Sequence, residues 1–212
     1  MLCLQIHMSD LDHASEFWNW FASYASEVRD AYRRNDHHWL ATNISLRIKR
    51  IADRLNWEIG PYREPDNTFV LSPTIRENLP ITRSTIAMAP KLKGWHFLHA
   101  KPPKELLSLE ISAHNCTINA DTWQYRLTSY NNGEFVDIEI FINADPDFPT
   151  AYQDLFCELA VESLIGEECR LDRVGYLIPT IVVDNTSIPN LTAIQHLKKH
   201  LDLVLTPSQV ET

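Results

Sequence analysis

Glycine is scarce in this sequence, with five residues among 212. Such a chain cannot supply the G-x-G-x-x-G fingerprint of dinucleotide-binding folds. It also contains neither the G-x-S-x-G nucleophile elbow nor a glycine-rich loop that ends in a Walker A lysine. The sequence therefore lacks the familiar signatures of dinucleotide binding, serine hydrolysis and P-loop chemistry.

Cysteine is limited to four residues, with no CxxC pair and no tight cluster. This usage is typical of reduced thiols in a cytoplasm rather than of a disulfide framework or a zinc site. Cys157 and Cys169 could pair with a histidine in space to form a nucleophile, but Cys157 lies in an apolar helical stretch, where buried thiols are the common case. We therefore predict no catalytic cysteine.

Positive charge and long apolar runs are also lacking. The formal net charge is −9, and residues 1–56 contain as many basic as acidic residues, so the rest of the chain carries the whole imbalance. This disfavours a phosphate backbone as a partner. No apolar run approaches the ~20 residues of a membrane span, and the N-terminus lacks the basic region of a signal peptide. We expect a cytoplasmic protein that binds neither nucleic acid nor a membrane.

The composition that remains is that of a globular protein, with 44% hydrophobic and 22% charged residues. Its length favours a single domain over residues 1–205, followed by a flexible polar tail over 206–212.

Two antiparallel helices are expected over residues 12–55. Apolar residues recur at spacings of three and four over 12–34, which predicts one buried stripe of a helix. Asp36 then provides an N-cap for a second helix with the same pattern up to Leu55.

The next segment, 57–100, predicts two strands (57–62 and 68–72), a helix from Pro80 to about Ala89, and a strand that contains Trp95 and Phe97. Within the stretch APKLKGWHFLHAKPP, Pro90 helps to end the helix and Gly94 permits a tight reversal. We interpret this stretch as scaffold rather than as a functional loop.

A β-hairpin is predicted around Asn132-Gly133, because this pair favours the two positive φ angles of a type I′ turn. A two-residue loop places Arg126 opposite Glu139 and Thr128 opposite Asp137 on one face of the hairpin. The opposite face then carries six apolar or aromatic side chains: Trp123, Tyr125, Leu127, Ile138, Ile140 and Ile142. A sheet with one buried and one polar face is therefore expected.

The second half, 105–183, continues with a helix that opens at the capping-box spacing Thr150 to Gln153 and ends at Gly166, followed by a strand over 174–183. A terminal helix is predicted over 191–203. Since the order strand, strand, helix, strand occurs twice, the sequence suggests two similar ββαβ halves. The fold class is α+β, with an N-terminal helical pair packed on a mixed, mostly antiparallel sheet.

The strings WEIGP (57–61), FVLSP (69–73) and AP-x-L-x-GW-x-F (89–97) resemble a group of bacterial proteins known only as a domain of unknown function. The resemblance covers roughly residues 40–105. It implies a soluble bacterial α+β protein of a kind found near toxin, immunity and stress-related genes, and it implies no catalytic residues.

Histidine pairs give weak metal signals. His196 and His200 lie four apart on a predicted helix but lack the glutamate of an HExxH motif, and Lys198 and Lys199 add positive charge beside them. His37 and His38 are adjacent and point in different directions on a helix. Asp145 and Asp147 resemble half of a calcium loop, without its glycine and closing glutamate. We therefore predict no metal and no cofactor.

A basic stripe of Arg47, Lys49, Arg50 and Arg54 on the second helix is interpreted as a solvated helix face, because it is short and the rest of the chain is acidic.

The leading functional hypothesis is a non-catalytic binding protein of the immunity or regulatory type. The predicted polar hairpin face, with Arg126, Thr128, Asp137 and Glu139, would contact a protein partner. The alternative is a hydrolase with a histidine and carboxylate site assembled from separate elements. A deep pocket that gathers two or more of five residues would favour it: His13, His37, His38, Asp145 and Glu168.

Overall fold

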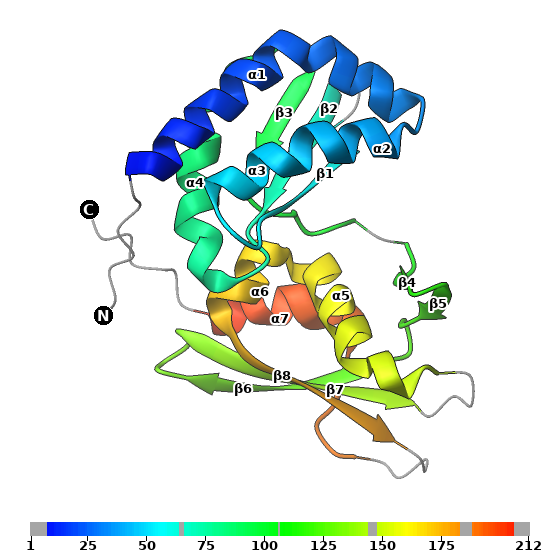
Figure 1. Cartoon of the computed structure of the whole chain (residues 1–212). Helices are drawn as coiled ribbons and strands as arrows, with labels where there is room; N and C mark the ends of the chain where they lie inside the picture. The colour runs from blue at the N-terminus through cyan, green and yellow to red at the C-terminus, as the bar shows by residue number, and fades with distance from the viewer. Residues whose placement is uncertain (1–7, 64–65, 106, 144–147, 183–187, 206–212) are drawn as a thin grey trace. The chain divides into compact units, whose positions relative to one another are not determined.

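The computed structural model describes residues 8–63, 66–105, 107–143, 148–182 and 188–205. The chain divides into two compact units, Met1–Lys101 and Pro102–Thr212 (Figure 1). The division falls between the two predicted halves, 57–100 and 105–183, and the single domain over 1–205 stays a prediction.

The first unit begins with the expected helical pair. Helix α1 spans Met8–Arg33, and it is followed by α2 (His37–Leu40), a π-helical segment (Ala41–Ser45) and α3 (Leu46–Ile51). The carboxylate of Asp36 caps α2, because its Oδ1 accepts a hydrogen bond from the backbone N–H of Trp39 at 3.0 Å. The second helix ends before the predicted Leu55, because Ala52 adopts extended backbone angles.

The sheet of this unit has the order β1-β2-β3. Strand β1 (Asn56–Arg63) pairs antiparallel with β2 (Asp66–Ser72), whereas β3 (Trp95–Leu98) pairs parallel with β2. A short 3-10 turn (Arg76–Asn78) and α4 (Leu79–Ala87) connect β2 to β3.

Aromatic side chains of α1 form the core of this unit against the sheet. Phe17 and Phe21 are buried beside Phe69 of β2, with ring centroids 5.7 and 5.3 Å away. Trp18 is also buried, and its indole N–H donates to the carbonyl of Thr85 in α4 at 2.6 Å. Full burial of one such side chain contributes roughly 1.5–3 kcal/mol to folding. The apolar spacing of the α1 sequence therefore explains why this helix covers the sheet.

The second unit begins with a small antiparallel pair, β4 (Glu110–Ala113) and β5 (Cys116–Asn119). A larger sheet has the order β8-β7-β6-β9. Its strands are β6 (Gln124–Tyr130), β7 (Phe135–Asn143), β8 (Val174–Val182) and β9 (Thr192–Ala193).

Helices of the second unit lie on one side of the larger sheet (Figure 1). A 3-10 turn (Thr150–Tyr152) leads into α5 (Gln153–Ile165), and α6 (Glu167–Arg173) follows directly. Another 3-10 turn (Ile194–His196) leads into α7 (Leu197–Val204). Phe156 of α5 and Leu201 of α7 belong to the same buried cluster as Ile138 and Ile140 of β7.

The predicted hairpin register is confirmed. Arg126 pairs with Glu139 and Thr128 pairs with Asp137. Asn132 and Gly133 have the positive φ angles expected of a type I′ turn, 57° and 89°, but Asn131 also has a positive φ of 50°. The turn spans 131–134 and the strand pairing ends at Tyr130 and Phe135, so the loop is longer than the predicted two residues. The agreement arises because the turn residues and the alternation of side chains specify the same pairing.

Both units contain the predicted ββαβ order. In each, an antiparallel hairpin is followed by a helix and by a strand that pairs parallel with the second hairpin strand, as β2 with β3 and β7 with β8. The fold is therefore α+β with mixed sheets, as predicted. The strands of the described residues form separate sheets, however, rather than one.

Two local predictions are wrong. Residues 192–193 belong to β9, which pairs with Gln124 and Tyr125 of β6, so the terminal helix begins later than predicted. The capping box at Thr150 does not form. A 3-10 turn occupies Thr150–Tyr152, its N-cap residue is Pro149, and no side chain forms a capping hydrogen bond there. Gly166, with a φ of 83°, ends α5 as predicted.

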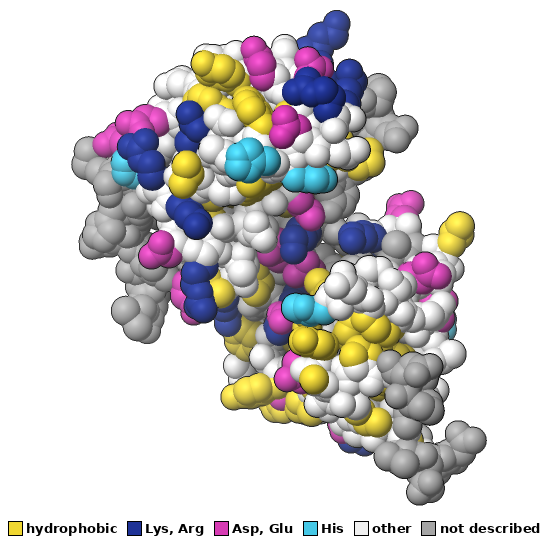
Figure 2. Space-filling view, turned by 45° about the vertical axis from the view of Figure 1, so that its right-hand side comes forward, with side chains coloured by type: hydrophobic (Ala, Val, Ile, Leu, Met, Phe, Trp, Pro, Cys, Tyr) yellow, Lys and Arg dark blue, Asp and Glu magenta, His cyan; other side chains and the backbone are white. Residues whose placement is uncertain are grey.

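Within the described residues, every helix is too short or too polar to cross a membrane. The face of the molecule in Figure 2 carries acidic side chains intermixed with basic ones, rather than one continuous basic field.

Candidate functional site

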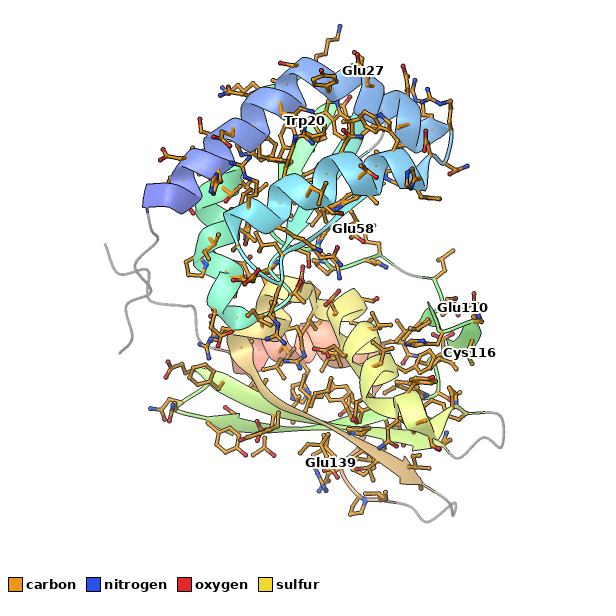
Figure 3. The ribbon with its side chains drawn as sticks, viewed as in Figure 1. Trp20, Glu27, Glu58, Glu110, Cys116 and Glu139 are labelled. Atoms are coloured by element: carbon orange, nitrogen blue, oxygen red, sulfur yellow. The ribbon has the colours of Figure 1, made fainter. Side chains whose placement is uncertain are left out.

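The side of the β8-β7-β6-β9 sheet that faces away from α5 and α7 is the candidate site, and we call it the outer face. Side chains alternate along each strand, so the residues next to buried Tyr125, Ile138 and Ile140 point to the outer face. Glu139 illustrates this direction (Figure 3). The outer face comprises residues from three strands: Gln124, Arg126, Thr128 and Tyr130 of β6, Asp137, Glu139 and Phe141 of β7, and Tyr176, Ile178 and Thr180 of β8.

The four residues predicted from the sequence lie together on the outer face. The Arg126 guanidinium donates from Nε and Nη2 to Oε2 of Glu139, at 3.2 and 2.5 Å. It also lies over the ring of Phe141, with the guanidinium carbon 5.5 Å from the centroid. Thr128 stands opposite Asp137. The carboxylate of Glu139 and the ring of Phe141 both belong to β7, so residues of this neighbouring strand hold the Arg126 side chain in place.

Strand β8 provides further partners for both carboxylates. The hydroxyl of Thr180 donates to Oε1 of Glu139 at 3.3 Å, and the backbone N–H of Tyr176 donates to Oδ1 of Asp137 at 2.9 Å. The hydrogen bond with Asp137 is the main cause that raises the pKa of the Tyr130 phenol, and burial is the second cause. The two negative charges of the outer face are thus engaged by groups of the same sheet.

Three apolar or aromatic side chains of the outer face remain accessible: Tyr176 is 72% exposed, Ile178 47% and Tyr130 46%. The hairpin interpretation identified neither Tyr176 nor Ile178 as part of this face. Their alternation within the predicted strand 174–183 was visible in the sequence. The parallel pairing of β8 with β7 has no short turn to specify it, so no local pattern in the sequence indicated their position.

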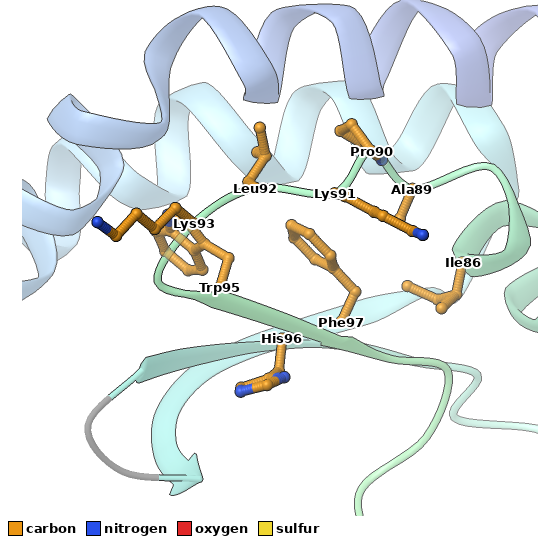
Figure 4. Close-up of a pocket in the computed structure, with 9 residues that line it drawn as sticks. All are labelled: Ile86, Ala89, Pro90, Lys91, Leu92, Lys93, Trp95, His96 and Phe97. Atoms are coloured by element: carbon orange, nitrogen blue, oxygen red, sulfur yellow. The ribbon is translucent and has the colours of Figure 1, made fainter.

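Unit 1 contains a cavity of about 490 Å³ beside β3 that is broadly open to solvent. Its wall consists of the end of α4, the following loop and β3, as Figure 4 shows. The lining residues are mainly apolar with two lysines and one histidine: Ile86, Ala89, Pro90, Lys91, Leu92, Lys93, Trp95, His96 and Phe97. None of the residues named for the hydrolase alternative is among them, and Asp145 lies outside the described residues.

The stretch that we interpreted as scaffold therefore has two roles. Gly94 does adopt a positive φ of 80°, which fits the expected reversal. The residues around it, however, also line this cavity. A loop that places lysines beside aromatic residues was visible in the sequence, but the cavity depends on how β3 pairs with β2.

The histidines are dispersed. His37 and His38 are exposed at the start of α2, and His96 lies 3.2 Å from the carboxylate of Asp66. Nδ1 of His200 lies 3.0 Å from the hydroxyl of buried Tyr125, whereas His196 is exposed. In the part of the chain that the structure describes, no group of three metal-ligating side chains occurs. Asp145 and Asp147 lie outside that part.

Burial favours the protonated form of the Cys157 and Cys169 thiols. It raises the pKa of Cys157 to about 12, with the charge of Asp154 as a second cause, and it also raises the pKa of Cys169. Since the thiolate is the nucleophilic form, the environment of these two cysteines opposes nucleophilic chemistry at neutral pH.

The basic stripe of the second helix contacts α1. The Arg47 guanidinium lies 4.2 Å from the ring centroid of Trp20, and Arg50 forms an ion pair with Glu16 at 2.9 Å. These two arginines are therefore engaged within unit 1.

Comparison of the chain with protein-family models, with curated proteins and with solved structures found no match. The resemblance to the bacterial domain of unknown function therefore stays a prediction.

Proposed function

We propose that this protein is a non-catalytic binding protein whose outer face engages a protein partner. The observation that carries the proposal is the exposure of Tyr176, Ile178 and Tyr130 on a sheet face whose charged groups are already paired. The sequence resemblance supports a narrower form of the proposal, in which the protein is a cytoplasmic bacterial protein of the immunity or regulatory type.

Aromatic side chains support such a contact because tyrosine is enriched at protein interfaces. A tyrosine buries a large apolar area and loses little conformational entropy. Tyr176 and Ile178 stand on neighbouring outward positions of β8, so one partner surface would cover both. Because β8 is an edge strand of the sheet, a partner can approach this part of the face from the side as well.

The paired charges support a role in selecting the partner. Arg126 and Glu139 satisfy each other in the free protein, so a partner needs no opposite charge to cover them. A charged group of the partner placed beside this ion pair would be attracted by one of the two charges and repelled by the other. We expect most of the affinity to come from Tyr176 and Ile178, with Arg126 and Glu139 affecting specificity.

The test is retention of a partner from a lysate of the source cells at moderate salt. The outer-face variant carries both Tyr176→Ser and Ile178→Ser. The matched control is Leu203→Ser, which removes an exposed apolar side chain (77% exposed) from α7. We expect a stoichiometric protein to be retained by the wild type and by the control but not by the outer-face variant. Equal retention by all three forms would contradict the proposal.

A further inference from the structure

We propose that the cavity beside β3 binds a small aromatic anion, in which an apolar ring system is joined to a carboxylate or a similar acidic group. This site lies in unit 1 and is independent of the outer face of unit 2. The proposal depends on three properties of the cavity wall, which are its apolar floor, its excess of positive charge and its engaged hydrogen-bond acceptors.

The apolar part of the wall fits a ring system. Trp95 and Phe97 are offset and nearly parallel, with centroids 6.3 Å apart and an interplanar angle of 6°. Ile86 at the end of α4 and Leu92 of the loop add aliphatic surface (Figure 4). The volume of about 490 Å³, much of it open to solvent, lies within the roughly 300–1,000 Å³ of small-molecule sites.

The charge of the wall is positive. Lys91 and Lys93 are exposed, and neither forms an ion pair with a residue of the described ranges. The carboxylate of Asp66 in β2 is paired with His96 at 3.2 Å. His96 also lines the cavity, but it points to the opposite side of β3 from Phe97 in Figure 4, so the His96–Asp66 pair does not lie on the side of the Phe97 ring.

Three carbonyl groups of the loop accept hydrogen bonds from other groups of the protein. The carbonyl of Leu92 accepts from the N–H of Trp95, and that of Lys93 accepts from Nη2 of Arg29, each at 3.2 Å. The carbonyl of Gly94 accepts from the N–H of Asn67 at 3.1 Å. These three carbonyl oxygens are therefore engaged by hydrogen bonds within unit 1.

Two buried donors beside the cavity also lack an acceptor. The indole N–H of Trp95 and Nε of Arg29 form no hydrogen bond in the described structure. The Arg29 guanidinium lies 5.8 Å from the Trp95 ring centroid, so both donors belong to one cluster. Both atoms are closed off from solvent, so neither can donate to a ligand in the cavity, and the preference for an anion rests on Lys91 and Lys93.

The probe is 8-anilinonaphthalene-1-sulfonate, an aromatic anion whose fluorescence rises in apolar surroundings. Its neutral analogue N-phenyl-1-naphthylamine has the same rings without the sulfonate. With the full chain under native conditions, we expect saturable binding of the anion at one site and at least about fivefold weaker binding of the neutral analogue. We also expect the affinity for the anion to fall as salt is added.

Variants locate the site. Lys91→Glu/Lys93→Glu should weaken binding of the anion at least about fivefold, since two favourable charges are replaced by two repulsive ones. The matched control is Lys49→Glu/Lys199→Glu, which makes the same change of charge at exposed lysines outside the cavity. Ala89→Phe keeps the charge and should abolish binding by filling the cavity. Circular dichroism and the unfolding midpoint confirm that each variant is folded.

Three outcomes would overturn the proposal. These are the absence of saturable binding, equal affinity for the neutral analogue, or equal loss of binding in the two charge variants. The partner-retention test of the outer face does not depend on dye binding at the cavity. Either proposal can therefore fail while the other stands.

Discussion

The carboxylate of Asp137 on β7 accepts a hydrogen bond from the backbone N–H of Tyr176 at the start of β8, at 2.9 Å. The bond lies where the pairing of β7 and β8 shifts register, between Val136 and Ile138. Asp137 therefore stabilises an irregular point of the sheet, and it is less available to a partner than the sequence suggested. The contact also holds Tyr176 on the outer face.

Gly175 permits this contact. A Cβ atom at this position would lie 2.7 Å from Oδ1 of Asp137. We expect Gly175→Ala to lower the free energy of unfolding by about 1–2 kcal/mol, because the carboxylate must move away from the N–H of Tyr176. Urea unfolding monitored by fluorescence measures this change. In an Asp137→Ala background the same substitution should cost clearly less, and equal costs in both backgrounds would contradict this role of Asp137.

Arg126 and Glu139 should stabilise the hairpin as a coupled pair. Both are partly exposed, so a double-mutant cycle with Arg126→Ala and Glu139→Ala should give a coupling of about 0.2–1 kcal/mol in the free energy of unfolding. The coupling should decrease when the salt concentration is raised. A coupling of zero at low salt would show that the ion pair contributes no stability.

Gly94 should tolerate substitution poorly. Its φ of 80° is unfavourable for other residues, and a Cβ atom would lie 2.9 Å from Nη2 of Arg29. We expect Gly94→Ala to reduce the free energy of unfolding by about 1–2 kcal/mol. In an Arg29→Ala background the steric part of this loss should disappear and the backbone part should remain. Unfolding by urea of the four proteins separates the two contributions.

Cys157 should make stability dependent on alkaline pH. Its folded pKa of about 12 lies above the ordinary 9.0, because burial disfavours the thiolate. The stabilising contribution is present below pH 9 and is lost as the pH rises toward 12, since the unfolded chain releases the proton first. Between pH 8 and pH 10 the wild type should lose about 1 kcal/mol more of its unfolding free energy than Cys157→Ala. Parallel pH profiles of the two proteins would contradict the buried thiol.

Local signals predicted the parts of the fold that depend on short-range geometry. Asn132-Gly133 fixed the register of β6 and β7, and Asp36 marked the start of α2, because each signal acts within a few residues. The capping-box spacing at Thr150 was misleading, because a 3-10 turn forms there instead. Residues 192–193 were assigned to a helix, although they pair with β6, since a two-residue edge strand has no periodicity of its own.

The candidate site was only partly predictable for the same reason. Arg126, Thr128, Asp137 and Glu139 follow from the hairpin register. Tyr176 and Ile178 join them only through a parallel pairing across a helical connection, which no local pattern specifies. The cavity near Trp95 likewise depends on β3 pairing parallel with β2.

The most direct test of the proposed function is the comparison of partner retention by the wild type, Tyr176→Ser/Ile178→Ser and Leu203→Ser. The outer-face account predicts that one stoichiometric protein is retained by the wild type and by Leu203→Ser and is lost from the outer-face variant, while all three forms remain folded. Retention of the same protein in equal amount by the outer-face variant, or retention of no protein by any form, would contradict it.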